Sequence, residues 1–309
     1  MAGFLARRLA QALVTIFGVA TLIFFLQRLT GDPTYLLVPE TATPADIDAM
    51  RRSLGFDRPL VVQYASFLAD LLRFDLGRSV IQNAPVTTII ASRVPYTLAL
   101  AAGALLVACG IGIPVGIAMA LWRDSVFAKA LSGLVLAAQS LPTFWSGILL
   151  ILVFAVTLGW LPPSATGGIS HLVLPSVALG LLSMATFARI TRTALLDELS
   201  RDYVRTARAR GVLPGRLLGR HLARNAAIPV ITVAALEISN LLAGAVIVET
   251  VFAWPGLGQV TVQSILARDF LVVQGVVLLG AFVTVALNLA ADILYSVVDP
   301  RIRLTGARA

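Results

Sequence analysis

The sequence predicts an all-α polytopic membrane protein with six transmembrane helices. Hydrophobic residues make up 58% of the 309 residues and charged residues only 13%, and the mean hydropathy of +0.89 is far from that of a soluble domain. Uncharged stretches of about 20 residues or more recur along the chain, and each is long enough to cross a bilayer as a helix. The single cysteine, Cys109, lies in an apolar stretch and receives no functional role.

The first predicted span runs from Leu9 to Gln27 and directly follows Arg7 and Arg8. A secretory signal peptide would show a shorter apolar region and a small-residue cleavage site, so we expect this helix to be retained. The expected segments are an N-terminal transmembrane helix over 1–30, an external helical insertion over 31–93, a core with five further spans over 94–298 and a tail over 299–309.

The external insertion is expected to hold amphipathic helices. Thr43 followed by Pro44 predicts a helix start, and Leu54-Gly55 predicts its end. A second helical run from Pro59 to Phe74 places a set of apolar residues on one face: Leu60, Tyr64, Phe67, Leu68, Leu71 and Leu72. The insertion is either a helical cap over the bundle or a lid or docking surface for a soluble partner.

The second span is expected between Arg93 and Arg123, with a kink favoured by Pro114. The charge-free stretch 130–188 is too long for one crossing, and the Pro- and Gly-rich segment 161–168 divides it into the third and fourth spans.

A fifth span is expected from about Ile228, and a sixth over 270–298. These two spans carry Glu237, Glu249 and Asp292, the ionisable residues within the predicted membrane segments. Such residues are candidates for function because an unpaired charge inside a membrane is costly. Glu237 and Asp292 are either internal helix contacts or part of a path through the protein, and Glu249 is expected near the outer interface.

The 24 Lys and Arg residues concentrate in segments that share one side of the membrane when both termini are cytoplasmic. That side includes the segment 198–229, whereas acidic residues balance the basic ones in 31–93. The net charge of +8 therefore reflects membrane topology and contact with lipid, and it does not indicate nucleic acid binding.

Several kinds of chemistry are excluded. Lys129 is the only lysine and follows Phe-Ala, so the chain has no Gly-rich phosphate loop ending in Gly-Lys-Ser or Gly-Lys-Thr. His171 and His221 fall on opposite sides of the predicted membrane and cannot share a metal site or a catalytic base pair. We therefore expect no catalytic residues and no metal or cofactor bound by this chain. An ion-driven transporter would usually carry more intramembrane charges.

The segment from Arg201 to Arg224 is rich in arginine, with Asp202 as its single acid. Composition alone fits either an anchor near anionic lipid or a binding element. The order of residues favours the second, because Gly211 ends one short helix and a second helical run continues to Pro229.

These residues resemble the cytoplasmic loop of binding-protein-dependent transporter permeases of the dipeptide and oligopeptide group. The general permease signature begins Glu-Ala-Ala and reaches Gly four residues later, whereas this chain has Arg205-Thr206-Ala207 before Gly211, a variant common in the peptide group. Phe74 stands where a Gly is common. Further matching motifs are Gly31-Asp32-Pro33, Asp75-Leu76-Gly77-Arg78-Ser79, Ser140-Leu141-Pro142-Thr143-Phe144-Trp145, Glu249-Thr250-Val251-Phe252-Ala253-Trp254-Pro255-Gly256-Leu257-Gly258 and Asp299-Pro300-Arg301.

The resemblance implies a type I ABC importer permease fold in the bacterial inner membrane. It implies pairing with a homologous second permease subunit as a heterodimer, two ATPase subunits that bind ATP and Mg, and an extracytoplasmic solute-binding protein. The implied substrates are di- or oligopeptides, with nickel complexes, glutathione, opines or oligosaccharides as alternatives. An ion-coupled secondary transporter is the alternative from another class.

Three groups of residues are expected to carry function, the first of them from the resemblance. The ATPase-contacting coupling helix would comprise Asp202, Tyr203, Arg205, Thr206, Ala207, Arg208, Ala209, Arg210 and Gly211. A strut joining it to the fifth span would include Arg220, His221, Arg224, Asn225 and Pro229. Candidates for the translocation path are Gln139, Ser140, Glu237 and Asn240.

Overall fold

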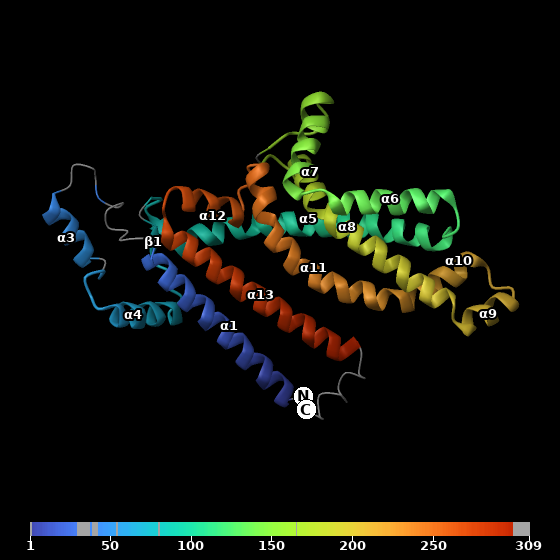
Figure 1. Ribbon diagram of the computed structural model, residues 1–309, viewed down its shortest axis with the longest axis horizontal. Helices are drawn as coiled ribbons and strands as arrows, with labels where there is room; N and C mark the ends of the chain where they lie inside the picture. Colours follow the sequence, from blue (N-terminus) through green and yellow to red (C-terminus); the bar gives the residue numbers. More distant parts are fainter. Residues whose placement is uncertain are drawn as a thin grey trace. The chain divides into compact units, whose positions relative to one another are not determined.

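The computed structural model describes residues 2–29, 38, 43–53, 55–79, 81–164 and 166–298 (Figure 1). The side chains of residues 2–6, 53, 214, 220–221 and 291–298 are not described. The Gly31-Asp32-Pro33 motif, the tail 299–309 and the side chain of Asp292 therefore lie outside the described residues. The chain divides into two compact units, one of Met1–Val94 with Val260–Ala286 and the other of Pro95–Gln259 with Leu287–Ala309.

Within the described residues, five helices are long and apolar enough to cross a membrane. Each coincides with a charge-poor stretch of the sequence, which confirms the all-α membrane fold. These helices are α1 (Ala2–Leu29), α5 (Val86–Leu121), α8 (Ile169–Leu199), α11 (Ala223–Val251) and α13 (Phe270–Val298).

The predicted third span is broken. Helix α6 (Val126–Ser140) and helix α7 (Thr143–Leu150), which continues as the π-helix η1 (Ile151–Thr157), meet at 106° and count as a sixth span only if taken together. The break lies at Leu141-Pro142, where Leu141 is extended with φ −84° and ψ 127°. Proline lacks a backbone N–H and disfavours helical conformation in the preceding residue, so the helix cannot continue through this point.

The first unit contains α1, α3 (Pro44–Ser53) and α4 (Leu60–Leu72). The predicted start of α3 is confirmed, because Thr43 Oγ1 donates to the Asp46 carboxylate at 2.7 Å and accepts from the Asp46 N–H at 3.3 Å. The hydrogen bonds that the Asp46 carboxylate accepts from the Thr43 hydroxyl and, at 2.9 Å, from the Thr43 N–H lower the pKa of the Asp46 carboxyl. The predicted helix end is also confirmed, since Gly55 adopts φ +72° just beyond α3.

Helix α4 packs against the C-terminal half of α1 through aromatic rings. The ring centroids of Tyr64 and Phe67 lie 5.1 and 5.5 Å from that of Phe24. The hydroxyls of Thr21 and Tyr64 are 2.6 Å apart. The predicted apolar face of α4 is thus confirmed at Tyr64 and Phe67, but Leu72, expected on the same face, is 83% exposed.

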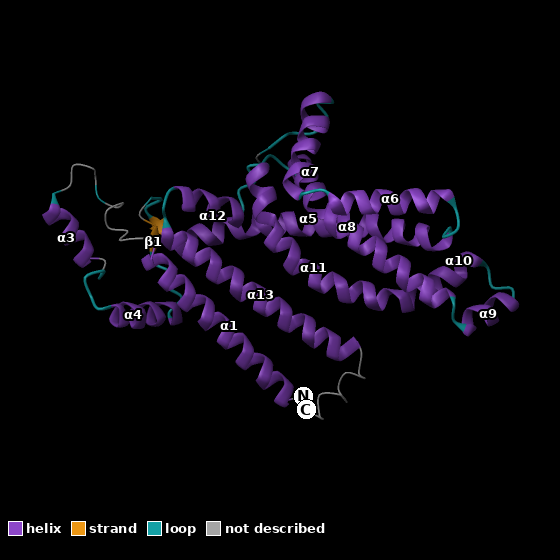
Figure 2. Cartoon of the chain, viewed as in Figure 1, coloured by secondary structure: helices purple, strands orange, loops and turns teal. Residues whose placement is uncertain are grey.

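A short antiparallel hairpin of β1 (Arg78–Ser79) and β2 (Ala84–Pro85) precedes α5, and the sequence pattern did not indicate it (Figure 2). The Ser79 hydroxyl donates a hydrogen bond to the Asp269 carboxylate, and both residues are buried. Asp269 directly precedes α13 and follows α12 (Leu257–Leu266). The hairpin is therefore tied to the junction of two helices in the same unit.

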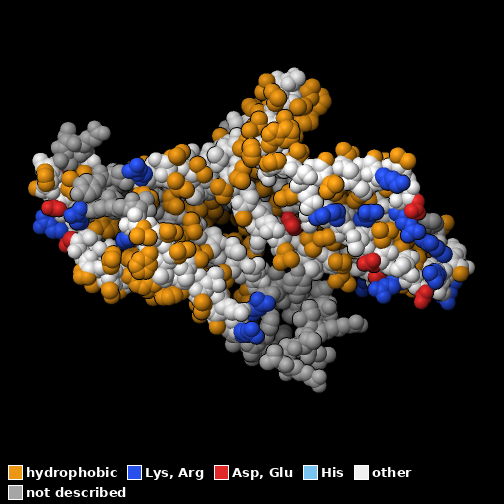
Figure 3. Space-filling view, in the orientation of Figure 1, with side chains coloured by type: hydrophobic (Ala, Val, Ile, Leu, Met, Phe, Trp, Pro, Cys, Tyr) orange, Lys and Arg blue, Asp and Glu red, His pale blue; other side chains and the backbone are white. Residues whose placement is uncertain are grey.

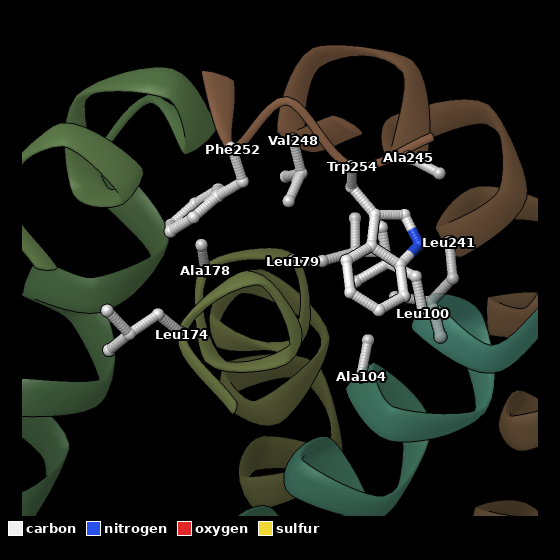
Figure 4. Close-up of a cluster of buried hydrophobic side chains, with 10 residues drawn as sticks. All are labelled: Leu100, Ala104, Leu174, Ala178, Leu179, Leu241, Ala245, Val248, Phe252 and Trp254. Atoms are coloured by element: carbon white, nitrogen blue, oxygen red, sulfur yellow. The ribbon is translucent and has the colours of Figure 1, made fainter. Parts of the chain in front are cut away.

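The second unit is organised around α8, which packs most extensively on α11 and also on α6 and α7. Helix α5 approaches α8 closely, since a Cβ atom at Gly112 would overlap the carbonyl oxygen of Met184. A buried apolar cluster joins α5, α8 and the end of α11 (Figure 4). Its members are Leu100, Ala104, Leu174, Ala178, Leu179, Leu241, Ala245, Val248, Phe252 and Trp254.

Candidate functional site

The Arg-rich segment forms two short helices joined by a tight turn, as predicted. Helix α9 (Asp202–Ala209) is followed by Gly211, which adopts φ +73° in the turn, and the Val212 N–H donates to the Ala207 carbonyl at 3.1 Å. Helix α10 (Pro214–Leu217) follows and runs through the π-helix η2 (Leu218–Leu222) into α11. Pro229 lies inside α11 and does not end the helical run, contrary to the prediction.

One face of α9 is buried in an apolar cluster. Val204 is fully buried and Ala207 packs against the same group. The other buried members come from the ends of α5 and α8, from α10 and η2, and from the start of α11: Ala120, Ala194, Leu195, Leu217, Leu222 and Ala226. Because well-packed interiors resist deformation, α9 is held firmly against the ends of three membrane-spanning helices.

A polar network adds to this attachment. The Tyr203 hydroxyl donates to Glu198 Oε2 at 2.5 Å, and Asn225 Nδ2 donates to the same oxygen at 3.2 Å. Arg201 Nε lies 3.9 Å from the other oxygen of Glu198. Burial, and to a smaller extent the hydrogen bond to Glu198, raises the pKa of the Tyr203 hydroxyl. Glu198 on α8 thus joins α9 to α11.

Sequence reasoning did not single out Glu198, because an acid at the end of a span next to arginines fits a simple surface charge. It also assigned Tyr203 to the outward contact. In the structure, Tyr203 contributes its hydroxyl to the internal network, although the residue is 38% exposed.

The opposite face of α9 is exposed and basic. Lys and Arg side chains gather at the end of the second unit that carries α9 and α10 (Figure 3). The Arg205 and Asp202 side chains, 80% and 96% exposed, are 3.8 Å apart, so this pair adds little stability. The predicted coupling residues that lie exposed are Asp202, Tyr203, Arg205, Thr206, Arg208, Ala209, Arg210 and Gly211.

The predicted strut forms part of the continuous helical run into α11. Arg224 and Asn225 are exposed in its first turn. Pro229 lines a hollow of about 430 Å³ together with Arg189 and Asp197 of α8. The side chains of Arg220 and His221 lie outside the described residues.

The predicted path residues are brought together only in part. Gln139, Glu237 and Asn240 line one cavity of about 400 Å³ beside the break between α6 and α7. The Glu237 carboxylate accepts hydrogen bonds from the Ser183 hydroxyl at 2.5 Å and from Asn240 Nδ2 at 3.4 Å. Ser140 does not line this cavity, and its exposed hydroxyl donates to the Leu136 carbonyl of its own helix at 3.0 Å.

Glu249, expected near the outer interface, is completely buried within the second unit. Its carboxylate accepts hydrogen bonds from the Thr97 hydroxyl at 2.6 Å, the Gly258 N–H at 2.6 Å and the Gln259 N–H at 3.2 Å. The Leu257 N–H in turn donates to Thr97 Oγ1 at 2.8 Å. Glu249 therefore caps the start of α12 and fixes its connection to α5.

Metal ligands do not gather anywhere in the part of the chain that the structure describes, where no three His, Cys, Asp or Glu side chains could hold an ion together.

Comparison with known families gives matches over most of the chain. Residues 112–304 match the family described as binding-protein-dependent transport system inner membrane component. Residues 1–101 match the N-terminal region described for the membrane components of the same systems. The two matches cover both units.

Individual proteins match along nearly the whole length. The chain is 39% identical to the Di/tripeptide transport system permease protein DppB of Pseudomonas aeruginosa, over 98% of this chain and 99% of that protein. It is also 39% identical to the Glutathione transport system permease protein GsiC of Escherichia coli, with the same coverage.

A solved structure supports the fold. A chain of the MetNI methionine ABC transporter, in an inward-facing conformation, matches with a TM-score of 0.59 and 21% identity, over 69% of this chain and 97% of that chain. The apolar helices, the family matches and the full-length relatives agree. The chain therefore belongs to the binding-protein-dependent transport system inner membrane component family, as a membrane-spanning permease subunit of an ABC importer.

Proposed function

We propose that this chain pairs with a homologous second permease subunit to enclose a path for di- or oligopeptides across the bacterial inner membrane. Two separate ATPase subunits bind ATP and Mg and power transport, and a solute-binding protein delivers the peptide from outside. The chain itself carries out no covalent chemistry. The peptide assignment is supported by the similarity to the Di/tripeptide transport system permease protein of Pseudomonas aeruginosa.

The ATPase contact is the exposed face of α9. The observation that carries this assignment is the complete burial of Val204, which fixes α9 to the ends of α5, α8 and α11. A helix that is packed on one face and exposed on the other can transmit a displacement of a docked partner to the helices on which it packs. Arg205 and Arg208 on the exposed face favour an acidic groove on the ATPase.

Transport follows from a change in the relative stability of two states. Closure of the ATPase pair on ATP moves α9 as a rigid body, and its buried attachment carries the ends of α8 and α11 with it. Access to the path then switches from the inner to the outer side, and hydrolysis of ATP resets it. This scheme requires α9 and both termini to lie on the cytoplasmic side.

The substrate assignment has alternatives within the same machinery. Glutathione is supported by the similarity to the Glutathione transport system permease protein of Escherichia coli. Glutathione is itself a small peptide, so both names point to short peptides. Nickel complexes, opines and oligosaccharides remain alternatives from the sequence resemblance alone.

The experiment is uptake by the complete transporter in proteoliposomes, with ATP inside and binding protein loaded with a labelled dipeptide outside. We expect uptake to require ATP. The double variant Arg205→Glu, Arg208→Glu should lose this uptake, and the ATPase subunits should no longer co-purify with it. The matched control is Arg123→Glu, an exposed charge reversal outside α9. Uptake that persists without the ATPases, driven by a proton or sodium gradient, would instead indicate a secondary transporter.

A further inference from the structure

Glu237 lies at mid-depth in a membrane-spanning helix. It is midway between Ala223 and Val251, the ends of α11. Its partner Ser183 lies at the middle of α8, and the hydroxyl of Ser183 donates to Oε2 of Glu237 at 2.5 Å. The carboxylate is therefore far from both ends of the two helices that hold it.

The same carboxylate lines the cavity beside the broken span. Its volume of about 400 Å³ falls within the range of small-molecule sites, about 300 to 1,000 Å³. Gln139 and Thr143, on either side of the break between α6 and α7, line it, and Thr186 and Asn240 add further polar groups. The break thus places polar side chains and the carbonyl end of α6, which carries partial negative charge, at the level of Glu237.

No cationic side chain balances Glu237 within the described part of the chain. The ion pairs described there involve Asp48, Asp124, Glu198 and Asp202. Arg189, two turns from Ser183 on α8, lines the separate hollow that contains Pro229. A carboxylate at this depth without a cation is costly and marks a functional site.

We propose that this cavity is a substrate site, in which Glu237 binds the ammonium group at the N-terminus of a transported peptide. Ser183 and Asn240 each donate a hydrogen bond to the carboxylate and so hold it toward the cavity as positioning residues. The inference rests on the proposed function, because it assumes that the substrate carries a free amino group. It adds a chemical requirement on the substrate within the permease itself.

A metal ion is a poorer occupant of the cavity. Hard cations such as Mg²⁺ and Ca²⁺ take six or more oxygen ligands, often from several carboxylates. Glu237 is the only acidic residue among those that line this cavity. One carboxylate with neighbouring hydroxyl and amide groups matches the single charge and three N–H donors of an ammonium group.

The test measures equilibrium binding of labelled Ala-Phe and of N-acetyl-Ala-Phe to the purified complex of permease and ATPase subunits, without the binding protein. We expect the wild type to bind Ala-Phe about tenfold or more tightly than the acetylated probe, as expected for one charge-assisted contact. Glu237→Gln should abolish this preference, and Ser183→Ala should reduce it. Asp124→Asn, which removes a surface carboxylate of the same charge, should keep it.

Equal binding of the two probes by the wild type, an unchanged preference in Glu237→Gln, or no binding at all would overturn the inference. Thermal melting and retention of the ATPases identify a variant that fails to fold, and Glu237→Asp then serves as a second variant with partial preference expected. Uptake of Ala-Phe by the complete transporter distinguishes a failure of the cavity assignment from a failure of the proposed transport function. If ATP-driven uptake is present while the preference is absent, only the cavity assignment fails, whereas absent uptake contradicts the proposed function.

Discussion

The hydroxyl of Thr97 donates a 2.6 Å hydrogen bond to the buried carboxylate of Glu249, a residue 152 positions later in the chain. Thr97 also accepts from the Leu257 N–H, and Glu249 accepts from the N–H groups of Gly258 and Gln259. Within the second unit, two side chains thus hold α5 at Thr97, the end of α11 and the start of α12 together. The Glu-Thr-Val-Phe-Ala-Trp-Pro-Gly-Leu-Gly motif has a structural explanation in this contact.

Replacing Thr97 by Val tests this contact, because Val has the same shape without the hydroxyl. The substitution removes the donor that Thr97 supplies to the buried carboxylate of Glu249, along with the Oγ1 acceptor of the Leu257 N–H. We expect the protein to lose about 1 to 3 kcal/mol of stability, the cost of removing a hydrogen-bond donor from a buried carboxylate. Thermal melting of the purified complex measures the loss. Thr250→Val is the control, since the exposed Thr250 hydroxyl bonds only to the Val246 carbonyl of its own helix.

The close approach of α5 to α8 predicts opposite effects for two glycines on one helix. A methyl group at Gly112 would overlap the carbonyl oxygen of Met184, whereas among the described residues no atom beyond the neighbouring backbone of α5 lies within 4 Å of the Cβ position at Gly110. We expect Gly112→Ala to lower the melting temperature and Gly110→Ala to raise it slightly, because Ala is favoured over Gly in a helix by about 1 kcal/mol. Equal shifts in the same direction would show that the approach of the two helices is not tight.

Phe74 adopts φ +57°, a left-handed conformation that costs a non-glycine residue about 1 to 2 kcal/mol. The residue is 84% exposed, so its side chain contributes little packing within this chain. We expect Phe74→Gly to stabilise the protein by about 1 kcal/mol in thermal melting. The neighbouring Arg73 has φ −90°, and Arg73→Gly should give no such gain.

The hydroxyl of Tyr203 predicts a dependence of stability on pH. Its pKa is raised in the folded protein by burial and by the hydrogen bond to Glu198, so folding favours the neutral phenol. This contribution is fully present below the unfolded pKa of about 10 and is lost as pH rises through the higher folded pKa. The melting temperatures of the wild type and of Tyr203→Phe should therefore differ near pH 8 and converge at higher pH. A difference that does not shrink would contradict the role of the hydroxyl as donor.

Much of the fold could be predicted from the sequence because membrane spans depend on local composition. The charge-free stretches indicated where the spans lie. Gly211 indicated the end of α9, because the turn there requires a left-handed backbone conformation that glycine adopts easily. The angle at Leu141-Pro142 could not be predicted, since proline ends a helix without fixing the direction of the next one. The contact of Thr97 with Glu249 was missed because it joins residues far apart in the sequence. Glu198 lies only five residues from Tyr203, and it was missed because an acid at the end of a span next to arginines fits a simple surface charge.

The most direct measurement of the central claim is disulfide or bifunctional crosslinking from α9 to the ATPase subunits in the complete transporter. Cysteine is placed at the exposed Thr206 in a chain with Cys109→Ser, and Asp124→Cys serves as the control on another exposed turn. The predicted result is a crosslink from Thr206→Cys to an ATPase subunit, with a yield that changes when ATP is bound, and little crosslinking from Asp124→Cys. An absent crosslink from Thr206→Cys in an intact, transport-active complex would contradict the assignment of α9 as the ATPase contact.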